Sequence, residues 1–142
     1  MDTLRINIPR NEKRIEVNDS GDYIVLPLGD QTFLPDILAL IRDFRAYAIE
    51  LQSAAASVSG DRLDSIVETA ERNAAMCRAL ADKVDGMFGD GACVKIFGVR
   101  VPGLEAFADF FGQLSPIVQR FSEQQRNAAL EKARKYTDKY KT

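Results

Sequence analysis

The sequence predicts an α+β fold that is mainly helical. Three observations predict it: apolar residues alternate near the N-terminus, recur every seven residues in the centre, and form an aromatic helical pattern later in the chain. The chain has 142 residues, which suits one domain with its own core. We assign residues 1–125 to this single domain and residues 126–142 to a basic, helix-prone C-terminal tail.

Residues 1–29 are expected to form a small antiparallel β-meander. Apolar and polar residues alternate along three short segments, as in half-buried strands. The apolar positions are Leu4, Ile6, Ile8, Ile15, Val17, Ile24, Leu26 and Leu28. Turn-forming residues separate the segments at 9–12 and 18–22. Pro27 cannot donate a hydrogen bond to a neighbouring strand, so the third strand should lie at an edge or end early.

Residues 30–88 are expected to form an antiparallel helical hairpin. Asp30 suits the N-cap, and Pro35 is compatible only with the first helical turn. The apolar residues of the first helix recur every seven positions, at Ile37, Phe44, Leu51 and Val58. After a break at 59–61, with Asp61 as the next N-cap, a second helix presents mainly small side chains: Ala70, Ala74, Cys77 and Ala81. A connection this short forces the two helices antiparallel.

Residues 89–125 comprise a glycine-rich loop and an aromatic helix. The stretch from residue 88 to residue 98 reads FGDGACVKIFG. A phosphate-binding loop needs GxxxxGK followed by Ser or Thr, and this stretch lacks that spacing. The favoured interpretation is a turn in which Gly89 forms a left-handed C-cap. Residues 92–97 are then expected to form a short extended segment.

The aromatic helix begins near Gly103, and Pro116 interrupts it. The apolar spacing of three and four residues continues past the proline, which favours a kinked third helix. Ser115 as N-cap, with Pro116 at the first helical position, would equally start a fourth helix. Phe110 lies about 100° from Phe111 around the helix and widens the apolar face. Because a surface wider than a core needs is typical of a partner site, we predict partner-binding residues. They are Phe107, Phe110, Phe111, Leu114 and Phe121.

No catalytic, cofactor-binding or metal-binding residues are expected, and the protein is predicted not to be an enzyme. The chain has no histidine, and its cysteines, Cys77 and Cys93, form no CxxC motif. Cys77 falls on an apolar helix face, whereas Cys93 lies in the glycine-rich loop with no predicted cover. Four aspartates lack the spacing of a calcium loop and are interpreted as solvated helix ends. They are Asp82, Asp85, Asp90 and Asp109.

Charge and hydropathy narrow the expected partners and location. The net charge is −2, and residues 126–142 carry six basic and two acidic residues, so the tail is +4 and the rest −6. The tail lacks the aromatic and recognition-helix signals of nucleic-acid binders, so nucleic acid is not an expected partner. No apolar run approaches the ~18 residues of a membrane span, and the N-terminus has no apolar signal core. We therefore expect a soluble protein in the cytoplasm.

The order of these elements resembles a family of small tail assembly chaperones from siphophages and prophages of Gram-positive bacteria. The likeness lies in RINIPRNEKRIEVNDSGDYIVLPLGDQTF, FGDGACVKIFG and VPGLEAFADFFGQLSPIV. That family has an FG(D/E)G…K(I/V)FG element followed by an aromatic helix similar to FF(D/E/G)QL. The likeness covers most of the chain except the basic tail.

The resemblance implies a non-enzymatic protein in the cytoplasm of the bacterial host. Such chaperones coat the long tape measure protein, keep it soluble, and help tail tube subunits polymerise around it. The expected partners are therefore the tape measure protein, the tail tube protein and further copies of this chain. The alternatives are a structural phage subunit or a self-associating helical adaptor and, least favoured, an enzyme or small-ligand binder that uses the glycine-rich loop with Lys95.

Overall fold

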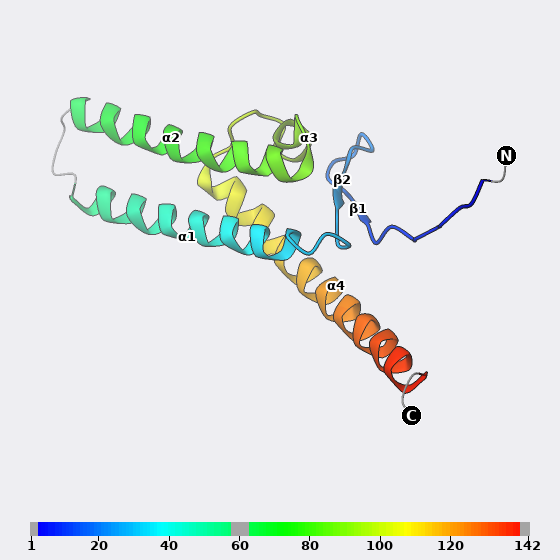
Figure 1. Ribbon diagram of the computed structural model, residues 1–142. Coiled ribbons are helices and arrows are strands. Elements are labelled where there is room, and N and C mark those ends of the chain that lie inside the picture. Colours follow the sequence, from blue (N-terminus) through cyan, green and yellow to red (C-terminus); the bar gives the residue numbers. More distant parts are fainter. Residues whose placement is uncertain (1–2, 58–62, 140–142) are drawn as a thin grey trace.

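A two-stranded sheet and four helices make up the computed structural model, which describes residues 3–57 and 63–139 (Figure 1). The elements are β1 (Lys13–Glu16), β2 (Tyr23–Leu26), α1 (Phe33–Ser57), α2 (Leu63–Phe88), α3 (Ala92–Phe97) and α4 (Leu104–Lys139). The α+β, mainly helical fold class is confirmed.

The sheet is an antiparallel hairpin, in which Ile15 lies opposite Ile24. The side-chain oxygen of Asn18 closes its turn by accepting hydrogen bonds from the backbone N–H groups of Ser20 and Asp22, at 2.9 and 3.2 Å. β2 ends at Leu26, immediately before a proline, as predicted. The two inward-facing β2 side chains, Ile24 and Leu26, are buried against the helices.

The predicted first strand of a meander is wrong. Residues 3–12 form no strand, and Leu4, Ile6 and Ile8 are 93%, 86% and 80% exposed. The cause lies at Asn11, whose carbonyl accepts the backbone N–H of Gly29 at 2.9 Å. This bond holds residue 11 alongside the end of β2. The chain therefore does not reverse direction at residues 9–12, and the segment before them does not pair with β1.

α1 and α2 run antiparallel, as predicted, and lie side by side along their length in Figure 1. Pro35 occupies the first turn of α1. The carboxylate of Asp30 accepts hydrogen bonds from the N–H and hydroxyl of Thr32, at 2.9 and 2.7 Å. Asp30 thus stabilises the turn that precedes Phe33, and it is not adjacent to the helix as an N-cap would be. The predicted Asp61 cap and Val58 lie outside the described residues.

The core lies at one end of the helical hairpin. It gathers β2, the first part of α1, the last part of α2, α3 and the first part of α4. The most deeply buried side chains are Leu26, Ile37, Leu40, Leu80, Val84, Cys93 and Phe107. The predicted α2 stripe is correct near this end, where Cys77 and Ala81 are buried. Towards the other end it fails, because Ala70 is exposed and Ala74 is only half-buried.

Residues 92–97 form the helix α3, so the predicted extended segment is wrong. Glycines in the left-handed region flank the helix: Gly91 has φ 80° and Gly98 has φ 78°. The carboxylate of Asp85, on α2, accepts the backbone N–H of Cys93 at 2.9 Å. Gly89, directly after α2, also has a positive φ of 108°, in agreement with the predicted turn. The two flanking glycines and the hydrogen bond to Asp85 together define the ends of α3. The helix is too short for its apolar spacing to predict it from the sequence.

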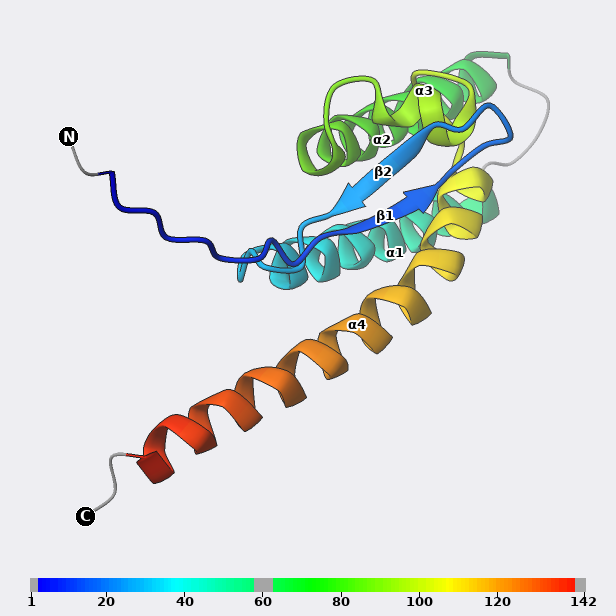
Figure 2. The same cartoon turned by 90° about the vertical axis from the view of Figure 1, so that its right-hand side faces the viewer.

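α4 is one helix that continues through Pro116 to Lys139, which confirms the third-helix interpretation over a fourth helix. Ser115 is not an N-cap, because its hydroxyl donates to the carbonyl of Phe111 at 2.7 Å. Figure 2 shows the axis of α4 changing direction between its yellow and orange parts, as a proline inside a helix causes. The described part of the basic tail is helical and exposed.

Candidate partner-binding groove

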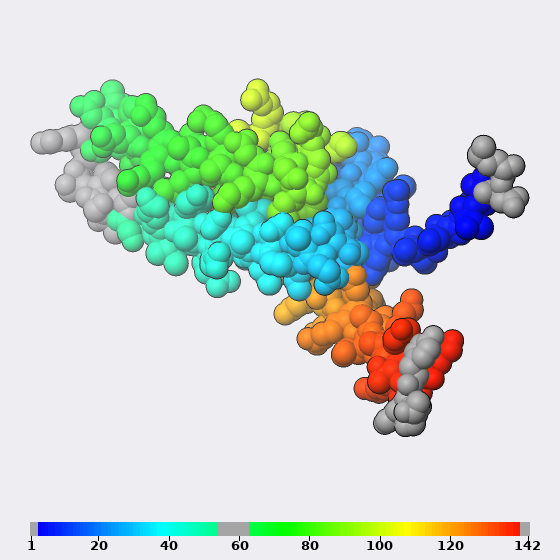
Figure 3. Space-filling view, in the orientation of Figure 1, coloured from blue at the N-terminus to red at the C-terminus, as the bar shows by residue number. Residues whose placement is uncertain are grey.

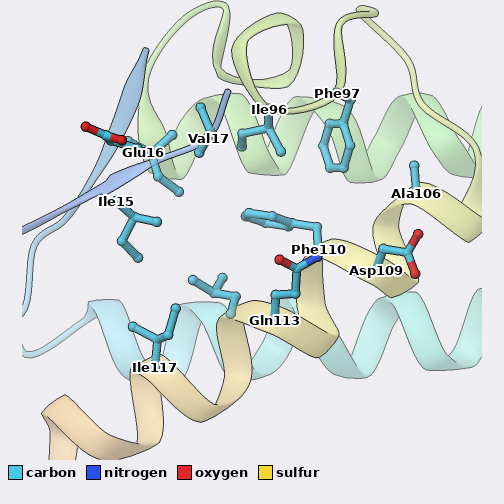
Figure 4. Close-up of a pocket in the computed structure, with 12 residues that line it drawn as sticks. Ile15, Glu16, Val17, Ile96, Phe97, Ala106, Asp109, Phe110, Gln113 and Ile117 are labelled. Atoms are coloured by element: carbon cyan, nitrogen blue, oxygen red, sulfur yellow. The ribbon is translucent and has the colours of Figure 1, made fainter. Parts of the chain in front are cut away.

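A groove of about 300 Å³ lies between the β-hairpin, α3 and α4 (Figure 4). The hairpin contributes Ile15, Val17 and Ile24. α3 contributes Ile96 and Phe97, and α4 contributes Ala106, Phe110, Gln113, Leu114 and Ile117. Elements distant in sequence therefore form one apolar concavity.

Phe110 is the central side chain of this groove. Its ring projects from α4 towards the hairpin, into the space between Ile15, Val17 and Ile96 (Figure 4). Three further phenylalanines hold it, with ring-centroid distances of 6.2 Å to Phe88, 5.5 Å to Phe97 and 5.5 Å to Phe111. The edge-to-face contacts with Phe88 and Phe97 add about 0.5–1.5 kcal/mol each beyond burial. The groove therefore has a firm aromatic wall.

The predicted partner-binding residues divide into core and surface. Phe107, Phe111 and Leu114 are 0%, 4% and 3% exposed, so they belong to the core, and of these three only Leu114 also lines the groove. They pack between the helices because α4 crosses the helical hairpin of α1 and α2. The sequence of α4 does not reveal this crossing. Phe110 is half-buried in the groove wall. Phe121 is also half-buried, and the ammonium of Lys13 lies 4.8 Å from its ring centroid.

Sequence reasoning missed the contributions of the hairpin and α3. Ile117 carried a usable signal, because it lies seven positions after Phe110 and therefore on the same face of α4. Ile15 and Ile96 carried none, since only the fold brings them to α4. A groove assembled from three elements is invisible to the periodicity of any one of them.

The charged groups that line the groove are all acidic. Glu16 and Asp109 are among the lining residues, which include no lysine or arginine. Figure 4 shows both carboxylates at the margins, one at each side of the apolar floor. The two acids do not face each other, so the lining offers apolar contact with a negative rim.

The stretch FGDGACVKIFG serves the fold. Cys93 is 1% exposed, and the pKa of its thiol is raised to about 12. Burial is the main cause, and the nearby Asp85 carboxylate adds to it. Burial also raises the pKa of Cys77. The Lys95 side chain is exposed, while its carbonyl accepts the side-chain amide of Asn18 at 3.0 Å. This bond ties α3 to the turn of the β-hairpin.

Two further features would bear on function: a metal-binding cluster and a membrane-spanning helix. Within residues 3–57 and 63–139, no cluster of three or more Asp, Glu, Cys or His side chains is placed to hold a metal ion. Among the described helices, none combines the length and apolarity that crossing a membrane requires.

The fold and groove define a small, mainly helical protein with an apolar surface depression. Residues 36–142 match a family of unknown function, DUF6673, and the chain belongs to that family. The match begins within α1, so the β-hairpin wall of the groove lies outside it. Comparison with curated proteins found no match, and neither did comparison with solved structures.

Proposed function

We propose that this protein is a non-enzymatic phage tail assembly chaperone. In this proposal it binds the tape measure protein in the cytoplasm of the bacterial host and supports assembly of the tail tube. The resemblance of its sequence blocks to the tail assembly chaperones supports the proposal. The observation that carries it in structural terms is the apolar groove around Phe110.

The groove suits apolar side chains from one face of a partner helix. An amphipathic helix docks its i, i+3, i+4 and i+7 side chains into such depressions. Burying one Leu, Ile or Phe side chain contributes about 1.5–3 kcal/mol, so two or three anchors support useful affinity. A long helix-rich client offers many such anchors, and coverage of them would keep it soluble.

Co-expression with the long coiled-coil protein encoded nearby in the source genome tests the proposal. Size-exclusion chromatography with light scattering should show co-elution, and the client should gain solubility. Co-elution would also give the stoichiometry of the complex. A client that stays insoluble in the presence of this protein would contradict the proposal.

Gln113→Arg is the sharpest variant for the groove. Gln113 is exposed and lines the groove, so a longer, charged side chain should obstruct it without disturbing the core. Gln119→Arg is the matched control, because Gln119 is exposed on the same helix and is not part of the lining. We expect the first variant to lose client binding and the second to retain it. Equal binding by both would remove the groove from the proposal.

The second candidate function is a structural phage subunit or self-associating adaptor. The exposed apolar residues of segment 3–12 favour it, since a stable subunit interface needs such surface. A homo-oligomer that ignores the coiled-coil protein in the same co-expression would move the conclusion to this candidate.

A further inference from the structure

The segment before β1, residues 3–12, which we call the arm, has no cover of its own. Leu4, Ile6 and Ile8 are the three most exposed large apolar side chains in the described structure, at 93%, 86% and 80%. Within the described chain, residues 3–9 make no hydrogen bond or ion pair. Figure 3 shows the arm, in blue, extending away from the body. Three large apolar side chains in water are a surface that a binding partner would bury.

The arm has the pattern of a strand but cannot reach its own sheet. Its apolar residues alternate with polar ones, so in an extended conformation Leu4, Ile6 and Ile8 share one face. The hydrogen bond between Asn11 and Gly29 directs the arm away from β1, as described above. Pairing of the arm with β1 in the same copy would require that bond to break. Pairing with another copy would not.

The sheet offers a matching edge. Among the described residues β1 pairs with β2 alone, so the second edge of β1 has unpaired backbone groups. β1 is also the more exposed strand of the pair. A strand added there would extend the face that carries Ile15 and Ile24, and this face forms one wall of the groove. The apolar face of the added strand would therefore turn towards Phe110.

Charge agrees with this arrangement. The arm carries Arg5, Arg10 and Glu12, and so has a net charge of +1; Arg10 lies 4.0 Å from the Glu12 carboxylate, whereas Arg5 has no such neighbour in the described structure. The groove has the carboxylates of Glu16 and Asp109 at its margins and no basic side chain in its lining. A basic, apolar strand thus meets an acidic, apolar groove, and this complementarity favours the correct partner during association.

We infer that the arm of one copy binds the groove of a second copy as a strand added to β1. The occupant is therefore a second copy of this chain, and the arm is a specific self-association element. Self-association requires no client. The arm would occupy the same groove that the chaperone proposal assigns to a client helix, so the two are alternative occupants of this site.

Two single variants test the two halves of the contact. Ile6→Asp places a charge on the apolar face of the arm, and Gln113→Arg adds a positive side chain to the groove. Asn7→Asp is the matched control for the arm, since it adds the same charge on the opposite face. Gln119→Arg is the control for the groove. Ile6 is 86% exposed, so its replacement leaves the folded body intact, and circular dichroism will check this.

Light scattering of the full-length chain over a concentration series gives the readout. We expect wild type and both controls to associate, and each test variant alone to associate at least about tenfold more weakly. A mixture of Ile6→Asp and Gln113→Arg should regain association, because one supplies an intact arm and the other an intact groove. A monomeric wild type, unchanged association of Ile6→Asp, or a mixture that stays monomeric would each overturn the inference. A monomeric wild type whose client binding is lost in Gln113→Arg would assign the groove to the client helix instead.

Discussion

Single residues decide the conformation of the glycine-rich stretch. Asp85 is the main example, because its carboxylate accepts the Cys93 N–H and so caps α3 across eight residues of sequence. From the sequence, Asp85 and Asp82 are both interpreted as solvated helix ends. The two aspartates lie three positions apart on α2, yet only Asp85 faces the start of α3. Spacing along one helix cannot distinguish them, because the difference lies in a second element.

Replacing Asp85 with Ala should lower the free energy of unfolding by about 1–2 kcal/mol, the usual cost of losing a helix cap. Urea unfolding followed by circular dichroism measures it. The control is Asp82→Ala, which removes an exposed carboxylate that makes no hydrogen bond or ion pair within the described residues and should change stability by less than ~0.5 kcal/mol. Equal losses in the two variants would show that the cap contributes nothing.

The buried thiols predict a specific dependence on pH. Folding raises the pKa of Cys93 from 9.0 to about 12, because burial disfavours the thiolate. This group therefore contributes stability fully below pH 9, and the contribution is lost as the pH rises from 9 towards 12. The unfolding midpoint of wild type should fall over this range more steeply than that of Cys93→Ala.

Thiol reactivity checks the same burial independently. At pH 8 a disulfide reagent should label neither Cys77 nor Cys93 in the folded protein and should label both after denaturation, since both are at most 3% exposed. Val94→Cys supplies the control, because Val94 adjoins Cys93 and is 48% exposed. Rapid labelling of native wild type would contradict the described core.

At the scale of elements, α4 combines two kinds of surface in one helix. Up to Val118 its inner face is buried, whereas from Arg126 to Lys139 every residue is exposed. Gln125 marks the boundary, where its side-chain amide donates to the carbonyl of Leu28. Pro116 lies between the two ends and lacks the N–H that would bond to the carbonyl of Gly112, so the helix bends there. The bend lets the first part follow the core while the rest extends away, as the orange and red helix does in Figure 3.

Removing residues 130–142 should leave the free energy of unfolding within about 0.5 kcal/mol of wild type, because the described residues removed are all exposed. The helical circular dichroism signal should fall in proportion. A longer truncation from residue 120 also removes Phe121 and Gln125 and should be clearly destabilising. If the short truncation destabilises just as much, the tail has a structural role in the fold.

The elements with long periodic patterns could be predicted from sequence, and the short ones could not. The helical hairpin and the continuation past Pro116 followed from apolar spacing over many turns. α3 spans six residues, and alternation at Leu4, Ile6 and Ile8 predicted a strand where none forms. Of the five predicted site residues, only Phe110 and Leu114 line the groove. Which face of α4 meets α1 and α2 depends on how the helices cross. That crossing is a tertiary property with no local signature.

At the scale of the whole molecule, stability is unevenly distributed. No side chain is buried between residues 41 and 53 or between residues 63 and 75, whereas Met76, Cys77, Leu80, Ala81 and Val84 are all buried in the next part of α2. The two helices therefore share a well-packed half and a thinly packed half. Figure 1 shows that the sheet lies at one end of this helical hairpin. Regions with few buried contacts open at lower free energy than the core.

Native-state hydrogen exchange should reveal this gradient, measured in the Ile6→Asp variant because that variant is expected to self-associate only weakly. Amides of residues 76–84 and 107–118 should exchange only through global unfolding, and amides of residues 45–53 and 63–72 should exchange through local opening. Mass spectrometry of peptic fragments gives the comparison within one sample. Uniform protection along both helices would contradict the gradient.

The contact between Leu28 and Gln125 joins positions 97 residues apart, and it has a consequence for synthesis. Ribosomes add roughly 5–20 residues per second, so about 5–20 s separate the appearance of the β-hairpin from that of the α4 residues that pack on it. During this interval the nascent chain lacks one wall of its core. Because contacts of such long sequence separation also slow folding, this domain closes only after Gln125 has been synthesised.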